Sequence, residues 1–314
     1  MSDFYGPADR VESLAAIQAA LEAGITLFDT GDFYGMGHNE LLLHEALVGA
    51  KRDRVFLQVK FGAQRAPSGA FIGFDGRPAA VKTALAYTLT RLGTDYVDLY
   101  QPARLDPAVP IEETVGAIAE LVRGGYVRYI GLSEVGAQTI RRAHAEHPIT
   151  ALQIEYSLMS RTIEAEILPT ARELGIGVTA YGVLCRGLLT GRSAQKAAGN
   201  DFRAHAPRWQ GENLEKNLAL VDALQAIAQA RRATPGQLAI AWVRSRGPDI
   251  IPLIGARRRS QLQESLGALE LDLAPDELER IERAVPAEQV AGNRYPDAGM
   301  ASLDSERHTH SQAG

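Results

Sequence analysis

The sequence predicts an α/β protein of the (β/α) barrel class, and three observations support this. Short apolar runs rich in β-branched residues alternate with longer stretches of helical period, the pattern of repeated βα units around a parallel sheet. No Gly-x-Gly-x-x-Gly motif follows the first strand candidate, so an open dinucleotide-binding sheet lacks its usual signature. The chain has 314 residues and 46% hydrophobic content, which suffices for one large core.

Each apolar run is expected to form one strand of the barrel. The seven strand candidates are residues 25–29, 55–60, 96–101, 127–133, 152–156, 177–181 and 250–254. The helix candidates are residues 11–22, 39–47, 78–92, 111–122, 137–145, two helices after residue 214, then 261–269 and 275–284. Several of these helical stretches end at glycine, as helices prefer.

A barrel of this class needs eight strands, and only seven are visible. The chain opens on a loop and a helix, so we expect the first strand to lie upstream of Met1. The alternative is an unrecognised strand in residues 182–210, a polar, Gly-rich and irregular segment. Residues 1–284 are expected to form a single barrel domain, and residues 285–314 a C-terminal arm or tail whose end is disordered.

Charge and composition narrow the class of partner. A net charge of −5 gives no general attraction to nucleic acid or to a membrane surface, so we expect a small-molecule partner and a monomer or weak homo-oligomer. The single cysteine, Cys185, excludes an internal disulfide, and no apolar run approaches about 18 residues. No secretion signal is visible near Met1, which favours a cytoplasmic protein. The scattered histidines predict no metal site.

The ends of the first two strands carry residues suited to proton transfer. In barrels of this class, catalytic side chains gather where strands end, and here Asp29 and Tyr34 follow the first strand while Lys60 ends the second. An ammonium group at Lys60 would stabilise the phenolate of Tyr34 and lower the pKa of that phenol, and Asp29 would hold Lys60 in place. The same spacing also fits an ordinary buried salt bridge beside a surface tyrosine.

Five stretches, in order, resemble the aldo-keto reductase superfamily: FDTGDFYG at 28–35, VKFG at 59–62, GLSE at 131–134, QIEYS at 153–157 and YGVLCRGLLTG at 181–191. The resemblance runs from Met1 to about Leu269. It implies a (β/α)8 barrel enzyme that transfers a hydride between NADPH/NADP and an aldehyde, ketone or alcohol substrate. By matching motifs, Tyr34 is the general acid, Lys60 its tuning cation and Asp29 the carboxylate partner.

This chain departs from the family pattern after the strand at 96–101. The family commonly carries a histidine there, and Ala103 stands in its place, followed by Arg104. We therefore expect slower turnover with catalysis retained. The competing hypothesis is a cofactor-binding redox sensor or interaction module with weak or no turnover.

The resemblance also implies a set of cofactor-binding residues. Ser133 and Gln153 match positions that bind the nicotinamide carboxamide, Tyr181 matches the stacking ring, and Glu134 stands where the family usually has asparagine. A carboxylate cannot donate a hydrogen bond, which puts one expected contact of Glu134 in doubt. The loop expected to fold over the pyrophosphate includes Leu184, Arg186, Gly187 and Leu188. The expected site for the 2'-phosphate comprises Gly255, Arg257, Arg258, Arg259 and Glu264.

Apolar rings near these strand ends suit a flat or hydrophobic carbonyl compound. The expected substrate pocket comprises Phe33, Phe61, Ala103, Arg104 and Trp209.

Overall fold

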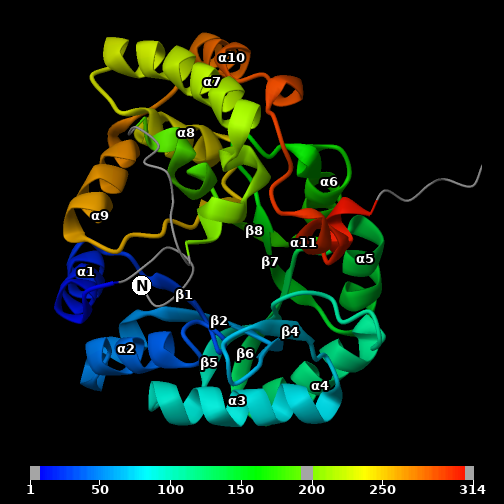
Figure 1. Ribbon diagram of the computed structural model, residues 1–314. Helices are drawn as coiled ribbons and strands as arrows, with labels where there is room; N and C mark the ends of the chain where they lie inside the picture. Colours follow the sequence, from blue (N-terminus) through cyan, green and yellow to red (C-terminus); the bar gives the residue numbers. More distant parts are fainter. Residues whose placement is uncertain (1–7, 192–200, 308–314) are drawn as a thin grey trace, which may run out of the picture.

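The computed structural model of the chain describes residues 8–191 and 201–307, and it contains a curved parallel sheet surrounded by helices (Figure 1). In sheet order the seven strands are β1 (Leu27–Gly31), β2 (Phe56–Phe61), β5 (Val97–Pro102), β6 (Val127–Ser133), β7 (Ile149–Glu155), β8 (Gly177–Tyr181) and β9 (Ile250–Pro252). All seven strand predictions are confirmed, with bounds that differ by at most three residues. The predicted barrel class is therefore confirmed.

Side chains of strands that are not neighbours meet inside the curve of the sheet. Gln58 on β2 donates from Nε2 to the Thr179 hydroxyl on β8 at 3.2 Å, and Gln153 on β7 donates to Asp29 on β1 at 2.7 Å. Such contacts require the sheet to curl around a common interior. β1 and β9 are its two edges, and no strand within the described residues joins them.

The irregular segment after β8 forms short 3₁₀ helices where it is described. These are η3 (Cys185–Thr190), η4 (Phe202–His205) and η5 (Pro207–Trp209). The alternative that this segment contributes an eighth strand is therefore wrong for its described part, and residues 192–200 lie outside the described residues.

Amphipathic helices cover the outer face of the sheet. They are α1 (Arg10–Glu22), α2 (His38–Ala46), α3 (Pro78–Leu92), α4 (Ile111–Arg123), α5 (Ala137–Glu146), α6 (Ile167–Glu173), α7 (Gly211–Ala230), α8 (Pro235–Ser245), α9 (Arg259–Leu266) and α10 (Pro275–Ala284). In α4, Ile111, Val115 and Ile118 form the buried face, and two glutamates in the first turn complement the helix dipole. α9 ends before the predicted residue 269, because residues 267–270 tighten into the 3₁₀ helix η6 (Gly267–Glu270).

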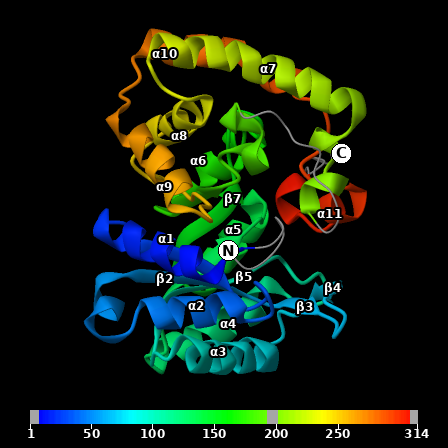
Figure 2. The same cartoon turned by 60° about the vertical axis from the view of Figure 1, so that its left-hand side comes forward.

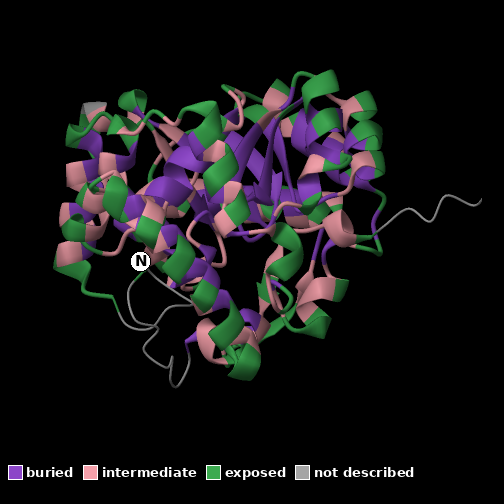
Figure 3. Cartoon of the chain, turned by 90° about the horizontal axis from the view of Figure 1, so that it is seen from above, coloured by how far each residue is buried: buried purple, intermediate pink, exposed green. Residues whose placement is uncertain are grey.

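The core lies between the sheet and these helices, where the buried strands contrast with the exposed outer faces of the helices (Figure 3). Val59, Ile130 and Leu152, on three different strands, have no exposed surface. Because the strands are covered on both faces, they read in the sequence as nearly continuous apolar runs.

A short antiparallel hairpin follows β2 and was not predicted. It consists of β3 (Ala63–Arg65) and β4 (Phe71–Phe74), and it projects from the barrel beside α3 and α4 (Figure 2). Gly62 begins it with a φ of +90°, and a Cβ atom there would lie 2.9 Å from the carbonyl oxygen of Asp75. Glycine is therefore required at the point where the chain leaves the barrel strand.

The chain after α10 forms an arm, residues 285–307, that returns to the barrel. It contains η7 (Ala287–Gln289), α11 (Asp297–Ala301) and η8 (Asp304–Glu306). Asn217 on α7 exchanges two hydrogen bonds of 2.9 Å with the backbone of Ala291, and Gly136 donates to Asp304 at 2.9 Å. The predicted disordered end falls on residues 308–314, outside the described residues. The boundary at 284, the cytoplasmic location and the oligomeric state stay predictions.

No helix within the described ranges combines the length and the apolar character that crossing a membrane requires.

Candidate active site

Asp29 and Lys60 form a buried ion pair between the ends of β1 and β2. The Lys60 Nζ atom lies 2.5 Å from Asp29 Oδ2, and the lysine side chain is only 3% exposed. Asp29 Oδ1 also accepts hydrogen bonds from Gln153 at 2.7 Å and from Gln58 at 3.3 Å. Burial alone would lower the pKa of Lys60, but the charges and hydrogen bonds of Asp29 and Tyr34 together outweigh burial and raise it. Lys60 therefore keeps its positive charge.

Tyr34 lies in the turn after β1, beside this ion pair. The Lys60 Nζ atom is 5.0 Å from the centre of the Tyr34 ring, and Phe33 contacts the ring edge-on with centroids 4.7 Å apart. Burial raises the pKa of Tyr34, and the charge of Lys60 lowers it by a smaller amount. The charge of Lys60 therefore acts in the predicted direction, but desolvation of the phenolate is the larger contribution, so the pKa of Tyr34 is raised overall. The phenol holds its proton at neutral pH.

The three predicted catalytic residues thus come together, whereas one predicted pocket residue does not join them. Phe61 follows Lys60 directly on β2, so its side chain points to the opposite face of the sheet. There it stacks on Tyr100 at 4.3 Å, whose hydroxyl donates to a carbonyl of α3. Phe61 is therefore a core residue, and the strict alternation of a strand would have revealed this in the sequence.

The remaining pocket candidates lie on loops. Ala103, 2% exposed, follows β5 and donates its backbone N–H to the carbonyl of Phe61 at 2.8 Å. Arg104 donates to the carbonyl of Ala103 at 2.6 Å and to the hydroxyl of Tyr295 at 3.4 Å. Trp209 is buried on η5, beneath the guanidinium of Arg203 at 5.3 Å.

Two of the predicted nicotinamide ligands are neighbours at the ends of β6 and β7. Ser133 pairs in register with Gln153, and the buried Ser133 hydroxyl has no hydrogen-bond partner within the described chain. A buried hydroxyl without a partner costs free energy, which fits a group intended for a ligand. On the next strand, the Tyr181 hydroxyl lies 3.1 Å from the hydroxyl of Tyr295.

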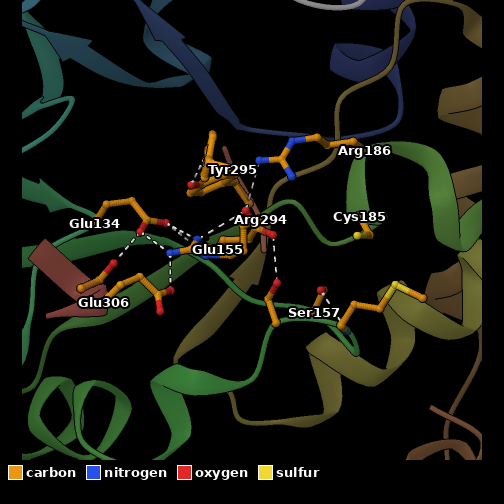
Figure 4. A network of polar contacts seen from close by, with 12 residues as sticks. Glu134, Glu155, Ser157, Cys185, Arg186, Arg294, Tyr295 and Glu306 are labelled. Carbon is orange, nitrogen blue, oxygen red and sulfur yellow. Dashed lines mark hydrogen bonds and ion pairs between the residues drawn. The ribbon is translucent and has the colours of Figure 1, made fainter. Parts of the chain in front are cut away.

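Glu134 contacts the C-terminal arm through its side chain. Its carboxylate accepts two hydrogen bonds from Arg294, at 3.0 and 2.8 Å, and one from Ser305 at 2.6 Å (Figure 4). Burial alone would raise the pKa of Glu134, but the charge and hydrogen bonds of Arg294 lower it to about 2. Glu134 also adopts a left-handed φ of +54°, a strained conformation for glutamate. Its carboxylate is therefore committed to holding the arm.

Glu155 extends this cluster from β7 toward the loop after β8 (Figure 4). Its carboxylate lies 3.4 Å from Arg294, 3.5 Å from Arg186 and 3.6 Å from Arg208. Glu306 adds a bond to Arg294 at 2.7 Å. The buried cluster therefore contains three arginines and three glutamates, namely Glu134, Glu155, Glu306, Arg186, Arg208 and Arg294, and its charges balance.

Sequence reasoning missed Arg294, Tyr295 and the structural role of Glu155. The available signal was the pair of acidic residues at positions 134 and 155, in strands that are otherwise apolar. Buried carboxylates require cationic partners. That requirement indicates an arginine or lysine, but not where in the chain it is located.

The loop after β8 turns through three consecutive left-handed residues. Cys185, Arg186 and Gly187 have φ values of +46°, +57° and +99°. The backbone N–H groups of Cys185 and Gly187 donate to the carbonyls of Gly182 and Leu184, at 2.7 and 2.9 Å, so these bonds hold the loop in a tight turn. It lies between Leu184 and the buried Leu188, and the Arg186 guanidinium lies over the rings of Tyr295 at 4.6 Å and Phe202 at 5.0 Å.

The three consecutive arginines after β9 make different contacts. Arg259 forms an ion pair with Glu12 of α1 at 3.0 Å, and Arg257 donates from its backbone to Gln261 at 2.9 Å. Arg258 is exposed at the start of α9 and makes no ion pair with any residue in the described ranges. The exposed Gly255 precedes the run, and Glu264 lies within α9. Arg258 is therefore best placed to meet a phosphate group.

Comparisons with known proteins agree with this geometry. The aldo/keto reductase family model matches residues 2–286. The chain is 44% identical over 296 residues to the probable aldo-keto reductase 1 of Glycine max, covering 93% of this chain and 84% of that protein.

Solved structures show the same fold. The glycerol dehydrogenase of Gluconobacter oxydans has a TM-score of 0.83 and 30% identity, covering 92% of this chain and 89% of that one. An aldo-keto reductase of Klebsiella pneumoniae in complex with NADPH has a TM-score of 0.69 and 28% identity, covering 88% and 86%.

Proposed function

The chain belongs to the aldo/keto reductase family, and from this premise we propose that it reduces an aldehyde or ketone to an alcohol with NADPH. Tyr34 is the proton donor in this proposal. The observation that carries it is the position of Lys60, which is paired with Asp29 at 2.5 Å and lies 5.0 Å from the centre of the Tyr34 ring. As the substrate oxygen gains charge, Tyr34 donates its proton, and the ammonium of Lys60 stabilises the phenolate that remains.

The residues around the ends of β6 to β9 fit NADPH, which supplies the hydride when it is bound. Ser133 offers a buried hydroxyl without a partner in the described chain, and the tight turn at residues 185–187 follows the end of β8 directly. Arg258, at the N-terminal end of α9, suits the 2'-phosphate, and Tyr181 would lie against the nicotinamide. The NADPH complex of the Klebsiella pneumoniae relative supports this choice of cofactor.

Glu134 takes a different role in the proposal. Both of its carboxylate oxygens bind Arg294, so we assign it to anchoring the arm and not to the carboxamide. Ala103 supplies no side-chain donor, so Tyr34 alone protonates the substrate oxygen. We therefore expect turnover to be slower than with a second donor.

The experiment that tests the proposal compares Tyr34→Phe with the parent protein. NADPH oxidation is followed at 340 nm with a panel of aldehydes, ketones and quinones. Loss of the general acid should lower kcat by about 100-fold or more. Tyr87→Phe, on an exposed face of α3, is the matched control and should retain full activity. Equal rates for Tyr34→Phe and the parent would refute the assignment of Tyr34.

One observation supports a second candidate, a cofactor-binding redox sensor with little turnover. The buried Ala103 occupies the position of the expected histidine and cannot take part in proton transfer. Titration with NADPH separates the two functions. The sensor would be favoured if the protein binds NADPH tightly but no compound in the panel oxidises NADPH. The same result is required in the reverse direction, where NADP should not oxidise glycerol. The reverse test follows from the glycerol dehydrogenase among the related structures.

A further inference from the structure

Arg104 forms no ion pair with a carboxylate in the described part of the chain, although the charge of Glu134 acts on it from a distance. It is half-buried just after β5. Its Nη1 donates to the carbonyl of Ala103 at 2.6 Å, and its Nη2 donates to the hydroxyl of Tyr295 at 3.4 Å. Both acceptors are neutral. A partly desolvated guanidinium without an anionic partner is unusual, because burial of a charge normally requires compensation.

The charged residues near Arg104 have ion-pair partners of their own. Lys60 is balanced by Asp29. Three arginines and three glutamates compensate one another in the cluster around Glu134 and Glu155. Compared with Lys60 and the three arginines of that cluster, Arg104 is therefore the cation without an ion-pair partner in the described chain.

The position of Arg104 relates it to the reacting groups. Its charge acts to lower the pKa of Tyr34, although burial raises that pKa overall. Its partner Tyr295 lies 3.1 Å from the hydroxyl of Tyr181 at the end of β8. Tyr295 is held by the adjacent Arg294, and the Arg186 guanidinium lies 4.6 Å from its ring centre (Figure 4). Arg104 is therefore connected through Tyr295 to the end of β8, and its charge reaches Tyr34.

We propose that Arg104 and the Tyr295 hydroxyl form a subsite for a carboxylate, and that the substrates are aromatic carbonyl compounds bearing a carboxylate. A guanidinium has donors beyond the two used here, arranged in a fork that matches a carboxylate. The aromatic scaffold is favoured by Phe33 beside Tyr34 and by Phe202, whose ring lies 5.7 Å from that of Tyr295. Reduction of the carbonyl group depends on the reductase function proposed above. Binding of the carboxylate at Arg104 does not depend on that function.

The kinetic test compares 4-formylbenzoate with 4-formylbenzamide, a neutral molecule of nearly the same shape, together with the meta isomers of both. For the parent protein we expect the acid to have a KM about 10- to 100-fold lower than the amide, the range for a hydrogen-bonded charge pair. Arg104→Gln should abolish this preference, which is measured as the ratio of KM for the amide to KM for the acid within each variant. Arg104→Lys should retain part of the preference for the acid, because lysine keeps the positive charge but lacks the paired N–H donors of the guanidinium. Arg123→Gln, exposed on α4, is the charge-matched control and should change nothing.

A binding test without cofactor separates this subsite from the proposed function. Calorimetry would measure 4-(hydroxymethyl)benzoate and 4-(hydroxymethyl)benzamide against the parent, Arg104→Gln and Arg104→Lys, each verified as folded by circular dichroism. A preference for the acid that Arg104→Gln removes supports the subsite, even if no carbonyl compound is reduced. Equal binding of acid and amide by the parent, or an unchanged preference in Arg104→Gln, would overturn it, even if reduction is observed.

Discussion

The carboxylate of Glu134 and the guanidinium of Arg294 form a two-point ion pair, at 3.0 and 2.8 Å, between the end of β6 and the C-terminal arm. Their side chains are 0% and 6% exposed. The pair places the adjacent Tyr295 against Tyr181 and Arg104. The arm is thereby part of the candidate site.

Glu134→Gln should strongly destabilise the protein. Removing one partner of a buried ion pair leaves Arg294 undercompensated and costs about 3–5 kcal/mol. Urea unfolding would measure this loss. Glu173→Gln, which breaks an exposed pair with Arg141, is the matched control and should cost about 1 kcal/mol or less. Equal effects of the two substitutions would contradict the anchoring role of Glu134.

The same ion pair predicts a loss of stability in acid. The pKa of Glu134 is lowered to about 2 in the folded protein, so the unfolded chain binds a proton at higher pH than the folded chain does. The stabilisation is complete above the ordinary glutamate pKa and is lost as the pH falls toward 2. Thermal unfolding between pH 6 and pH 3 should show a steeper decline for the parent than for Glu134→Gln. If the melting temperatures of the parent and Glu134→Gln fall in parallel with pH, Glu134 is not the source of the acid sensitivity.

Asp32 should lower the stability of the protein as the pH rises, whereas Glu134 lowers it as the pH falls. Burial, and then the charge of Glu40, raise its pKa to about 7, and its Oδ1 atom has no partner in the described chain. The folded protein then binds a proton that the unfolded chain has released, so stability falls as the pH rises from about 4 to 7. Asp32→Asn should be more stable than the parent at pH 8, by up to about 4 kcal/mol at 1.36 kcal/mol per pKa unit. Urea unfolding at pH 5 and pH 8 measures the difference in the free energy of unfolding between Asp32→Asn and the parent. The same difference at both pH values would contradict the raised pKa of Asp32.

Lys60→Met should abolish most of the proposed reductase activity. Without the ammonium, the main group that offsets the burial of Tyr34 is lost and the pKa of the phenol rises further, so proton donation becomes harder. We expect kcat to fall by about 100-fold or more, while NADPH binding is retained. Lys82→Met, which removes an exposed pair with Glu120, serves as the control. Activity close to that of the parent would show that Lys60 does not support Tyr34.

Arg258→Gln should weaken binding of NADPH more than that of NADH. A lost guanidinium–phosphate contact costs about 10-fold or more in the dissociation constant. Arg259→Gln should have the smaller effect, because Arg259 is already engaged by Glu12. Fluorescence titration with both cofactors checks this order. A larger effect of Arg259→Gln would reverse the assignment.

Local pattern was sufficient to predict the strands and the convergence of Asp29, Tyr34 and Lys60. Strand ends of a parallel barrel meet on one face, so position along each run indicated which side chains gather. Even the misplaced Phe61 follows from the alternation of a strand.

Other features depended on contacts that no local pattern contains. The direction of the Tyr34 pKa is set by burial, which arises only when distant segments pack around the phenol. Arg294 lies 160 positions after its partner Glu134, and no spacing rule connects the two. The acidic residues at strand ends indicated that a cation was needed, but only the folded chain identifies it.

The closing of the arm over the site has a consequence for how the protein is made. Asp29 and Lys60 are synthesised before Arg294 and Tyr295, which follow every barrel strand that the structure describes. A nascent chain that has completed β9 therefore carries Glu134 without its ion-pair partner, whereas Glu155 already has Arg186 and Arg208. The surroundings of Tyr181 and Arg104 therefore become complete only after β9 has been synthesised, so the order of synthesis separates the folding of the strands from the completion of the candidate site.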